Sequence, residues 1–216
     1  MLLNINKPKG LTSHDVIDRV RRITGERRVG HGGTLDPFAT GVLIVGVGRE
    51  TTKKLSIFLK GTTKEYLAVL ELGKTSSTYD PEGVIEKGGD VSSITKDSFE
   101  KILEEFEGES LQTPPPHSAI KIKGVPAYKL ARKGIDPQIE PRKVNIESIE
   151  LVDFQSPIAT IRVRVSSGTY IRSLADDIGK RLGTGAYLLE LTRTRVGEYK
   201  IEDSKTLKEI EDEINN

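Results

Sequence analysis

Residues 30–43 carry the most informative pattern in the chain and read Gly30-His31-Gly32-Gly33-Thr34-Leu35-Asp36-Pro37-Phe38-Ala39-Thr40-Gly41-Val42-Leu43. A single carboxylate, Asp36, stands between glycines and a proline, and an apolar run follows. Pro37 biases Asp36 toward an extended conformation, while Gly32 and Gly33 allow backbone torsions and close approaches that a side chain would forbid. The pattern predicts a shaped loop that presents Asp36 and leads into a buried strand.

The same residues also have two simpler interpretations. Asp-Pro and Gly-Gly are common in plain surface turns. A glycine-rich loop can also bind phosphate, but this one lacks the Gly-Lys-Ser or Gly-Lys-Thr of a nucleotide loop and the Gly-x-Gly-x-x-Gly that opens a dinucleotide-binding helix. The other segments of the chain have to decide between these interpretations.

The composition of the 216 residues indicates a globular protein, with 35% hydrophobic and 30% charged residues. No apolar run is long enough to cross a bilayer, and the N-terminus lacks the apolar segment of a secretory signal. These features predict a cytoplasmic protein without a membrane segment.

The chain contains no cysteine, which excludes disulfides, thiolate nucleophiles and thiolate metal sites. Its three histidines are widely spaced, and no His-Glu-x-x-His motif suggests a metal-binding helix. We therefore expect no metal, and we expect any catalysis to rest on carboxylate, tyrosine, lysine or arginine side chains.

Hydrophobic periodicity, capping residues and turn residues predict several short strands and helices, in no regular order. Strands are expected at 2–6, 42–47, 64–73, 120–124, 144–153, 157–165 and 189–199, and helices from Thr12 or Ser13 to Gly25 and at 50–59, 95–107, 126–133, 166–182 and 207–214. The absence of a regular strand–helix repeat favours an α+β fold around a mixed, mostly antiparallel sheet with flanking helices. No linker is evident, so residues 1–216 are predicted to form a single domain.

The net charge is only +1, but basic residues gather around the opening loop and in a turn-rich excursion at 112–140. This excursion contains three consecutive prolines and could form a mobile flap. The basic residues could contact the phosphates of a nucleic acid, or they could simply be solvated helix faces. The candidates for phosphate contact are Arg19, Arg22, Lys53, Lys54, Lys121, Lys123 and Arg132.

Two further residues stand out by their positions. Arg172 falls in the first turn of a predicted helix, where the helix dipole disfavours a cation, so a nearby anion is expected unless the arginine is simply exposed. Tyr66 lies near the beginning of a predicted strand, where its ring could either complete a core or line a cleft.

Several separated segments together resemble the TruB family of tRNA pseudouridine synthases, and they occur in the order that the family has. The matching segments are Lys7-Pro8-Lys9-Gly10-Leu11-Thr12-Ser13, residues 30–43 as quoted above, Lys64-Glu65-Tyr66, Pro114-Pro115-Pro116-His117-Ser118-Ala119, and Ser167-Gly168-Thr169-Tyr170-Ile171-Arg172-Ser173-Leu174-Ala175-Asp176-Asp177-Ile178-Gly179. The resemblance spans most of the chain.

This resemblance implies the pseudouridine synthase fold, with a central RNA-binding cleft. It implies isomerisation of uridine 55 in the T-loop of tRNA, with Asp36 as the nucleophile acting on a flipped-out uridine. It implies no cofactor, a tRNA partner bound through the T-arm, no obligatory protein partner and a monomer. Family members usually continue into a PUA-like C-terminal domain, which we expect this chain to lack.

The resemblance also assigns roles to individual side chains. Tyr66 would lie against the uracil and could also take part in proton removal. Tyr170 and Leu191 would contact the substrate, and His31 would stack or hydrogen bond in the recognised loop. Arg172 would pair with Asp36 and keep its carboxylate ionised. Structural support of the active site is expected from Lys7, Pro8, Gly32 and Gly33.

Three other functions remain open from the sequence. The chain could be an RNA chaperone that binds the T-arm without chemistry, or a pseudouridine synthase acting on another structured RNA, including one within a guide-RNA particle. A phosphate-loop nucleotide enzyme is disfavoured because the lysine motif is missing.

Overall fold

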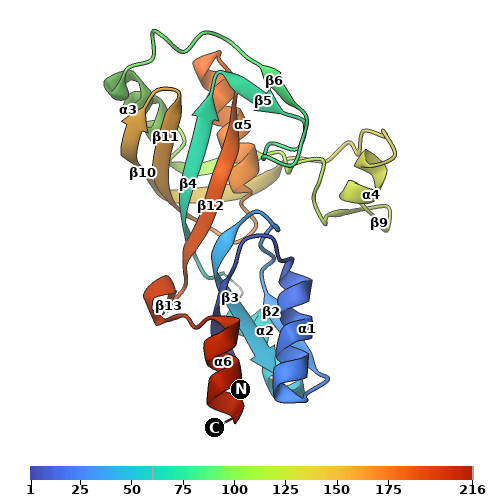
Figure 1. Ribbon diagram of the computed structural model, residues 1–216. Coiled ribbons are helices and arrows are strands. Elements are labelled where there is room, and N and C mark those ends of the chain that lie inside the picture. The colour runs from blue at the N-terminus through green and yellow to red at the C-terminus, as the bar shows by residue number, and fades with distance from the viewer. Residues whose placement is uncertain (60, 216) are drawn as a thin grey trace. The chain divides into compact units, whose positions relative to one another are not determined.

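A computed structural model describes residues 1–59 and 61–215, and the chain divides into two compact units (Figure 1). The first unit contains Met1–Leu67 and Leu191–Asn216, and the second contains Ala68–Glu190. Two strands, β4 (Lys64–Leu72) and β12 (Ala186–Val196), have residues in both units. The units are described in turn, and the single domain predicted from the sequence stays a prediction.

The sheet of the first unit is built around β3 (Thr40–Val47). Antiparallel to it run β1 (Leu2–Lys7) and β2 (Val29–Gly32), while β12 joins it in parallel through the pairs Thr192–Thr40 and Arg193–Gly41. A short strand, β13 (Tyr199–Lys200), then pairs antiparallel with β12, and the 3₁₀ turn Ile201–Asp203 follows. This sheet is mixed, as the sequence predicted.

Strand β3 is buried on both faces, which explains its uninterrupted apolar run. On one face, Leu43, Val45 and Val47 pack in one cluster with α1 (Ser13–Thr24) and α6 (Leu207–Asn215). On the other face, Val42 and Ile44 pack with Leu55 of α2 (Arg49–Phe58). The strand that follows the Asp36 loop is therefore held between two helical layers.

Helix α1 begins and ends as its sequence predicts. Thr12 is the N-cap and forms a reciprocal capping box with Asp15, while Gly25 closes the helix in the left-handed conformation at φ 66°. The stripe of Val16, Ile17 and Val20 is buried. Its capping residues and its apolar face together fix where this helix lies against β3.

The sheet of the second unit contains β4, β11 (Ile158–Val165), β10 (Arg142–Gln155) and β7 (Gly108–Gln112), in that order. Strands β10 and β11 form the antiparallel pair that their alternating residues predicted. Helix α3 (Lys96–Glu104) contacts β10, where Phe99 stacks on Phe154 at 5.5 Å between ring centroids. Helix α5 (Ile171–Leu182) is buried along its inner face and is capped by Gly183.

Two small ribbons complete this unit. Strands β5 (Lys74–Ser76) and β6 (Ile85–Lys87) form one of them. Strands β8 (Lys121–Ile122) and β9 (Val125–Pro126) form the other, which leads into the short helix α4 (Ala127–Ala131). Figure 1 shows that β9 and α4 lie on an excursion of the chain, within the predicted 112–140 segment.

Several elements differ from the sequence-based expectation, among them β2, which is a strand over residues 30–32 where a loop was predicted. Strand β7 was not predicted, because four of its five residues are exposed and it therefore lacks the alternation of a half-buried strand. Helix α5 begins at Ile171 and not at residues 166–169, where Ser166 and Thr169 instead form a turn. Tyr170 takes the N-cap position without a side-chain cap, so the expected serine or threonine cap was wrong.

Candidate active site

Asp36 lies in a loop of residues 33–39 that joins β2 to β3 in the first unit. A tight turn follows it, in which the Ala39 N–H donates to the Asp36 carbonyl at 3.1 Å. Leu35, Phe38 and Ala39 are buried, whereas Asp36 itself is partly exposed. The apolar residues of the loop therefore pack inward, while Asp36 remains partly exposed.

The loop is tied to the segment before α1 by hydrogen bonds on both sides of Asp36. The buried Ser13 hydroxyl accepts from the Leu35 N–H at 2.9 Å and lies 3.0 Å from the Leu35 carbonyl, to which it donates. The Gly10 N–H donates to the Pro37 carbonyl at 2.8 Å. Residues of the Lys7–Ser13 motif therefore hold the backbone on either side of the nucleophile candidate.

Lys7 is fully buried beneath the same loop. Its Nζ donates to the carbonyls of Leu11 at 2.6 Å, Pro8 at 3.0 Å and Pro37 at 3.3 Å. Burial lowers the pKa of Lys7 to about 8, while the Asp36 carboxylate acts to raise it and Arg193 acts to lower it. Lys7 therefore holds backbone carbonyls of the segment before α1 and of the loop, and its role in supporting an active site stays a prediction.

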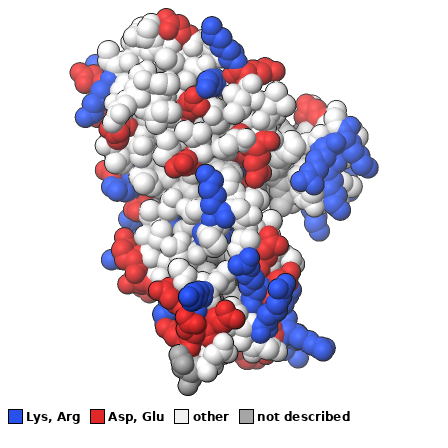
Figure 2. Space-filling view, viewed as in Figure 1, with Lys and Arg blue, Asp and Glu red and all other residues white. Residues whose placement is uncertain are grey.

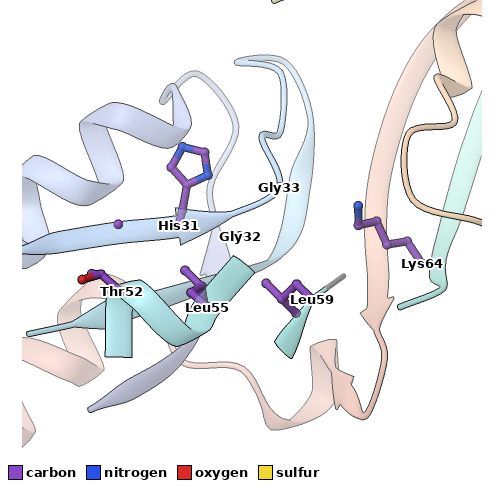
Figure 3. A pocket seen from close by; sticks show the side chains of 8 residues that line it. His31, Gly32, Gly33, Thr52, Leu55, Leu59 and Lys64 are labelled. Carbon is purple, nitrogen blue, oxygen red and sulfur yellow. The ribbon is translucent and has the colours of Figure 1, made fainter. Parts of the chain in front are cut away.

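A pocket of about 350 Å³ lies beside the loop in the first unit. Figure 3 shows Leu55 and Leu59 on one side of β2 and the His31 ring on the other, with Lys64 beyond Gly33. At Gly32, a Cβ atom would lie 1.7 Å from Leu59 Cδ1 and 3.4 Å from Leu55 Cγ, so a side chain at this position would require the Leu59 side chain to move. The pocket is lined by Gly30, His31, Gly32, Gly33, Thr52, Leu55, Leu59 and Lys64.

Two titratable groups of this pocket have lowered pKa values. Burial, with a smaller repulsion from Arg193, lowers the pKa of Lys64 to about 8. Burial also lowers the pKa of His31, with Arg193 and His14 contributing. His31 Nδ1 is a buried atom with no hydrogen-bond partner among the residues that the structure describes. Both side chains therefore lose their protons at a lower pH than is usual for a histidine or a lysine.

Tyr66 and Leu191 belong to the first unit as well, and both are 6% exposed. Tyr66 lies in β4, two residues after Lys64, so the two side chains leave the strand on the same face. Leu191 lies in β12, and its carbonyl is 3.5 Å from the Thr40 hydroxyl at the start of β3. The sequence left open whether the Tyr66 ring is buried, and it is.

Arg172 lies in the first turn of α5 in the second unit, and it is buried. Its guanidinium is 3.2 Å from the Asp80 carboxylate and donates to the carbonyls of Thr78 and His117, each at 3.1 Å. The expected anion beside this arginine is therefore confirmed in Asp80. The pairing of Arg172 with Asp36 stays a prediction.

The partner Asp80 is itself held by its neighbours in the 77–83 turn. The Thr78 hydroxyl donates to the Asp80 carboxylate at 2.5 Å, and the Glu82 N–H donates to it at 3.0 Å. Tyr79, between Thr78 and Asp80, has a φ of 64°, which is uncommon for a residue with a bulky side chain. The turn therefore presents two oxygen groups to Arg172, the backbone carbonyl of Thr78 and the side-chain carboxylate of Asp80.

Tyr170 is fixed to the end of β7 by the side chain of Gln112. The Tyr170 N–H donates to Gln112 Oε1 at 2.8 Å, and Gln112 Nε2 donates to the Tyr170 carbonyl at 3.1 Å. Three residues after Tyr170, in α5, the Ser173 hydroxyl donates to the Thr113 carbonyl at 2.8 Å. The proline-rich segment is therefore joined to the start of the helix that carries Arg172.

The basic residues proposed to contact RNA are all exposed, in both units: Arg19, Arg22, Lys53, Lys54, Lys121, Lys123 and Arg132. Figure 2 shows basic side chains gathered over the excursion that carries α4, where Arg132 lies 5.6 Å over the Tyr128 ring. In the first unit, Arg19 and Arg22 share a groove with Glu211 and Asp212 of α6. Acidic side chains therefore lie next to this part of the predicted phosphate-binding surface.

Sequence reasoning missed three residues of this region. Arg193 and Lys64 lie beneath the Asp36 loop, and Asp80 holds Arg172. A buried cation can be recognised in a sequence only as a charged residue at a position where the strand pattern calls for an apolar one. Arg193 is such a case, because it lies two residues after Leu191 in β12 and therefore on the same face of the strand. In the described part of the chain, no cluster of side chains suited to a metal ion is found, and no helix is long and apolar enough to span a membrane.

Two models of known protein families match this chain. Residues 21–171 match the TruB family pseudouridylate synthase (N terminal domain), and residues 172–216 match the tRNA pseudouridylate synthase B C-terminal domain. The chain therefore belongs to the TruB family, as its motifs predicted. As a member it is a pseudouridine synthase, an enzyme that isomerises uridine in tRNA.

Individual relatives give the same result. The chain is 46% identical to a tRNA pseudouridine synthase B of Dehalococcoides mccartyi over 97% of its own length and 69% of that protein. It is 45% identical to the tRNA pseudouridine synthase B of Clostridium tetani, over 98% of its own length and 73% of that protein.

Solved structures support the predicted fold. A chain of a Cbf5–Nop10–Gar1 complex is 34% identical, with a TM-score of 0.76 over 98% of the present chain. The present chain spans about half the length of that solved relative, at 53%. The prediction of the pseudouridine synthase fold is confirmed.

Replacing Asp80 with Ala is expected to lower the free energy of unfolding by about 3 kcal/mol, because it leaves the buried Arg172 guanidinium without its carboxylate. Urea denaturation followed by circular dichroism measures this change. Glu86→Ala in the exposed strand β6 is the matched control and should cost less than about 0.5 kcal/mol. Equal stability of the two variants would show that the ion pair does not stabilise the fold.

The lowered pKa of Lys64 predicts a pH-dependent stability. Below pH 8 Lys64 is protonated in both the folded and unfolded states, whereas between about pH 8 and 10.5 the folded state releases its proton first. Stability relative to a Lys64→Met variant should therefore rise by roughly 1–2 kcal/mol between pH 7 and pH 9.5. Urea denaturation at both pH values measures it, with the exposed Lys54→Met variant as control. A difference that does not change with pH would contradict the buried position of the ammonium.

Proposed function

We propose that this chain converts uridine 55 in the T-loop of tRNA to pseudouridine, with Asp36 as the nucleophile. The observation that carries the proposal is the bracing of the Asp36 loop. Side chains of Lys7, Ser13 and Arg193 hydrogen bond to its backbone while its carboxylate stays partly exposed. A carboxylate that were only part of a surface turn would not need three buried side chains to fix it.

The reaction itself is consistent with a carboxylate. The N1–C1′ bond of uridine breaks, the base rotates, a C5–C1′ bond forms, and the proton lost from C5 is balanced by one gained at N1. The product has the composition of the substrate, so the isomerisation requires no redox cofactor or activated co-substrate. It does require a nucleophile that can add and leave again, and the chain has no cysteine for this purpose.

A uridine in a folded loop has to leave its stack before Asp36 can reach it. In this proposal the uracil lies against the Tyr66 ring and contacts Leu191, two side chains that the first unit already holds almost fully buried. His31 follows Gly30 at the edge of the same loop and stacks or hydrogen bonds with the recognised RNA. Buried aromatic and aliphatic groups lose little conformational entropy when a base packs on them.

Arg172 is proposed to pair with Asp36 and to keep the carboxylate ionised and aimed. Support comes from the fixed position of its guanidinium, which Asp80 and two backbone carbonyls orient within the second unit. Tyr170, at the N-cap of the same helix, is proposed to contact the substrate. A preorganised cation costs no reorganisation when the reaction begins.

Affinity for tRNA is proposed to come from the exposed cations of α1, α2 and the α4 excursion. Such phosphate contacts supply affinity and orientation but little sequence preference. Selectivity for the T-loop would then depend on the shape of the RNA and on its unstacked bases. Two other functions make different predictions: an RNA chaperone would bind without modifying, and a synthase for another structured RNA would modify outside the T-loop.

The decisive experiment maps pseudouridine at single-nucleotide resolution in unmodified tRNA incubated with the protein. We expect modification at position 55 by the parent and none by Asp36→Asn, since an amide is neutral and a poor nucleophile. Binding of tRNA by this variant should stay within about threefold of the parent. Asp90→Asn, at an exposed turn, is the matched control and should retain full activity.

Each alternative has its own outcome in this experiment. Turnover by Asp36→Asn would remove Asp36 from the role of nucleophile. Binding of tRNA without any pseudouridine in the parent would support the chaperone. Pseudouridine at other positions only would identify a different RNA substrate.

A further inference from the structure

Arg193 is the largest fully buried side chain that is charged, with 1% of its surface exposed. It lies in β12, beside the point where this strand pairs with Gly41 of β3. Gly41 has a φ of 99°, and a Cβ atom there would lie 2.3 Å from the Arg193 carbonyl. The backbones of the two strands therefore approach unusually closely where the arginine leaves its strand.

The Arg193 guanidinium donates to three backbone carbonyls that flank Asp36. Nε donates to Val42 at 2.7 Å, Nη2 to Gly33 at 3.1 Å and Nη1 to Thr34 at 3.4 Å. Gly33 and Thr34 precede Asp36 in the loop, and Val42 follows it in β3. One rigid, planar group therefore fixes the entrance of the loop relative to the strand at its exit.

The loop backbone also packs directly on this guanidinium. Gly33 has a φ of 88°, and a Cβ atom at this position would lie 3.6 Å from Arg193 Nη1 and 3.5 Å from Lys64 Nζ. The positive charge of Arg193 contributes to the lowered pKa values of both Lys7 and Lys64. These repulsions and the desolvation of a guanidinium are unfavourable, so a residue that only filled space would be better apolar.

We propose that Arg193 is a positioning residue for the reaction, which acts on Asp36 through the carbonyls of Gly33, Thr34 and Val42 and does not touch the substrate. The inference rests on the proposed role of Asp36. A lysine would not replace it fully, because an ammonium donates from one nitrogen, whereas Arg193 donates to the Val42, Gly33 and Thr34 carbonyls from three different nitrogens of one rigid group. Loss of the arginine would let the loop shift, and a displacement of about 1 Å at a nucleophile can lower the rate of chemistry by about 100-fold.

The test compares Arg193→Met, Arg193→Gln and Arg193→Lys with the parent in single-turnover and steady-state assays on tRNA. We expect kcat to fall by about 100-fold in Arg193→Met, KM to change by less than about threefold, and Arg193→Lys to recover only part of the rate. Arg195→Met, two residues further along the same strand, is the matched control. Its Nε donates to the Gly197 carbonyl in the β12–β13 turn, so kcat should stay unchanged.

Four outcomes would overturn the proposal. An unchanged kcat in a less stable Arg193→Met would make the residue purely structural, and a raised KM with unchanged kcat would make it a substrate contact. Full rescue by Arg193→Lys would show that charge alone matters. A crystal structure of Arg193→Gln gives a result that depends neither on activity nor on the role of Asp36. The proposal expects residues 33–36 to move in this variant, and a loop that has not moved would contradict it. If Arg193→Met does not fold, the Gln and Lys variants decide by the same criteria.

Discussion

The bracing of one loop by side chains that hydrogen bond to its backbone is the constraint on which the first unit depends. A loop of residues 33–39 cannot satisfy its carbonyls within a regular ladder, so the buried ones need other partners. Lys7, Ser13 and Arg193 supply these partners from the strand before α1, from the start of α1 and from β12. The loop is consequently held as firmly as a strand while Asp36 remains partly exposed.

The layers of the first unit bring these partners to the loop. Helices α1 and α6 pack on one face of β3 and α2 on the other, which brings Ser13 of α1 to Leu35 of the loop and Leu59, just after α2, to Gly32 at the end of β2. Burying Lys7 and Arg193 fully and Lys64 in part is costly, as the lowered pKa values of the two lysines indicate. Such unfavourable burial is typical of functional sites, where stability is given up for a fixed geometry.

Much of this arrangement follows from local sequence patterns, and the remainder does not. The ends of α1, the double burial of β3 and the pairing of β10 with β11 come from capping residues and periodicity, which are local. Resemblance to known motifs singled out Asp36 as the candidate nucleophile. The contacts of Arg172 with Asp80 and Thr78 and that of Arg193 with Gly33 could not be predicted, because they join residues about 90 and 160 positions apart. Strand β7 was missed because its exposed residues show no alternation. Long-range hydrogen bonds to backbone carbonyls leave no periodic trace in a sequence.

Native-state hydrogen exchange of the parent protein tests the rigidity of the Asp36 loop most directly. The amides of Gly10, Leu35 and Ala39 all donate hydrogen bonds in this region, to Pro37, Ser13 and Asp36 respectively. If the loop is braced, they should exchange at least about 100-fold more slowly than the exposed turn amide of Ser92, after correction for intrinsic rates. Exchange as fast as that of Ser92 would show that the loop opens freely, and would contradict the account of Asp36 as a preorganised nucleophile.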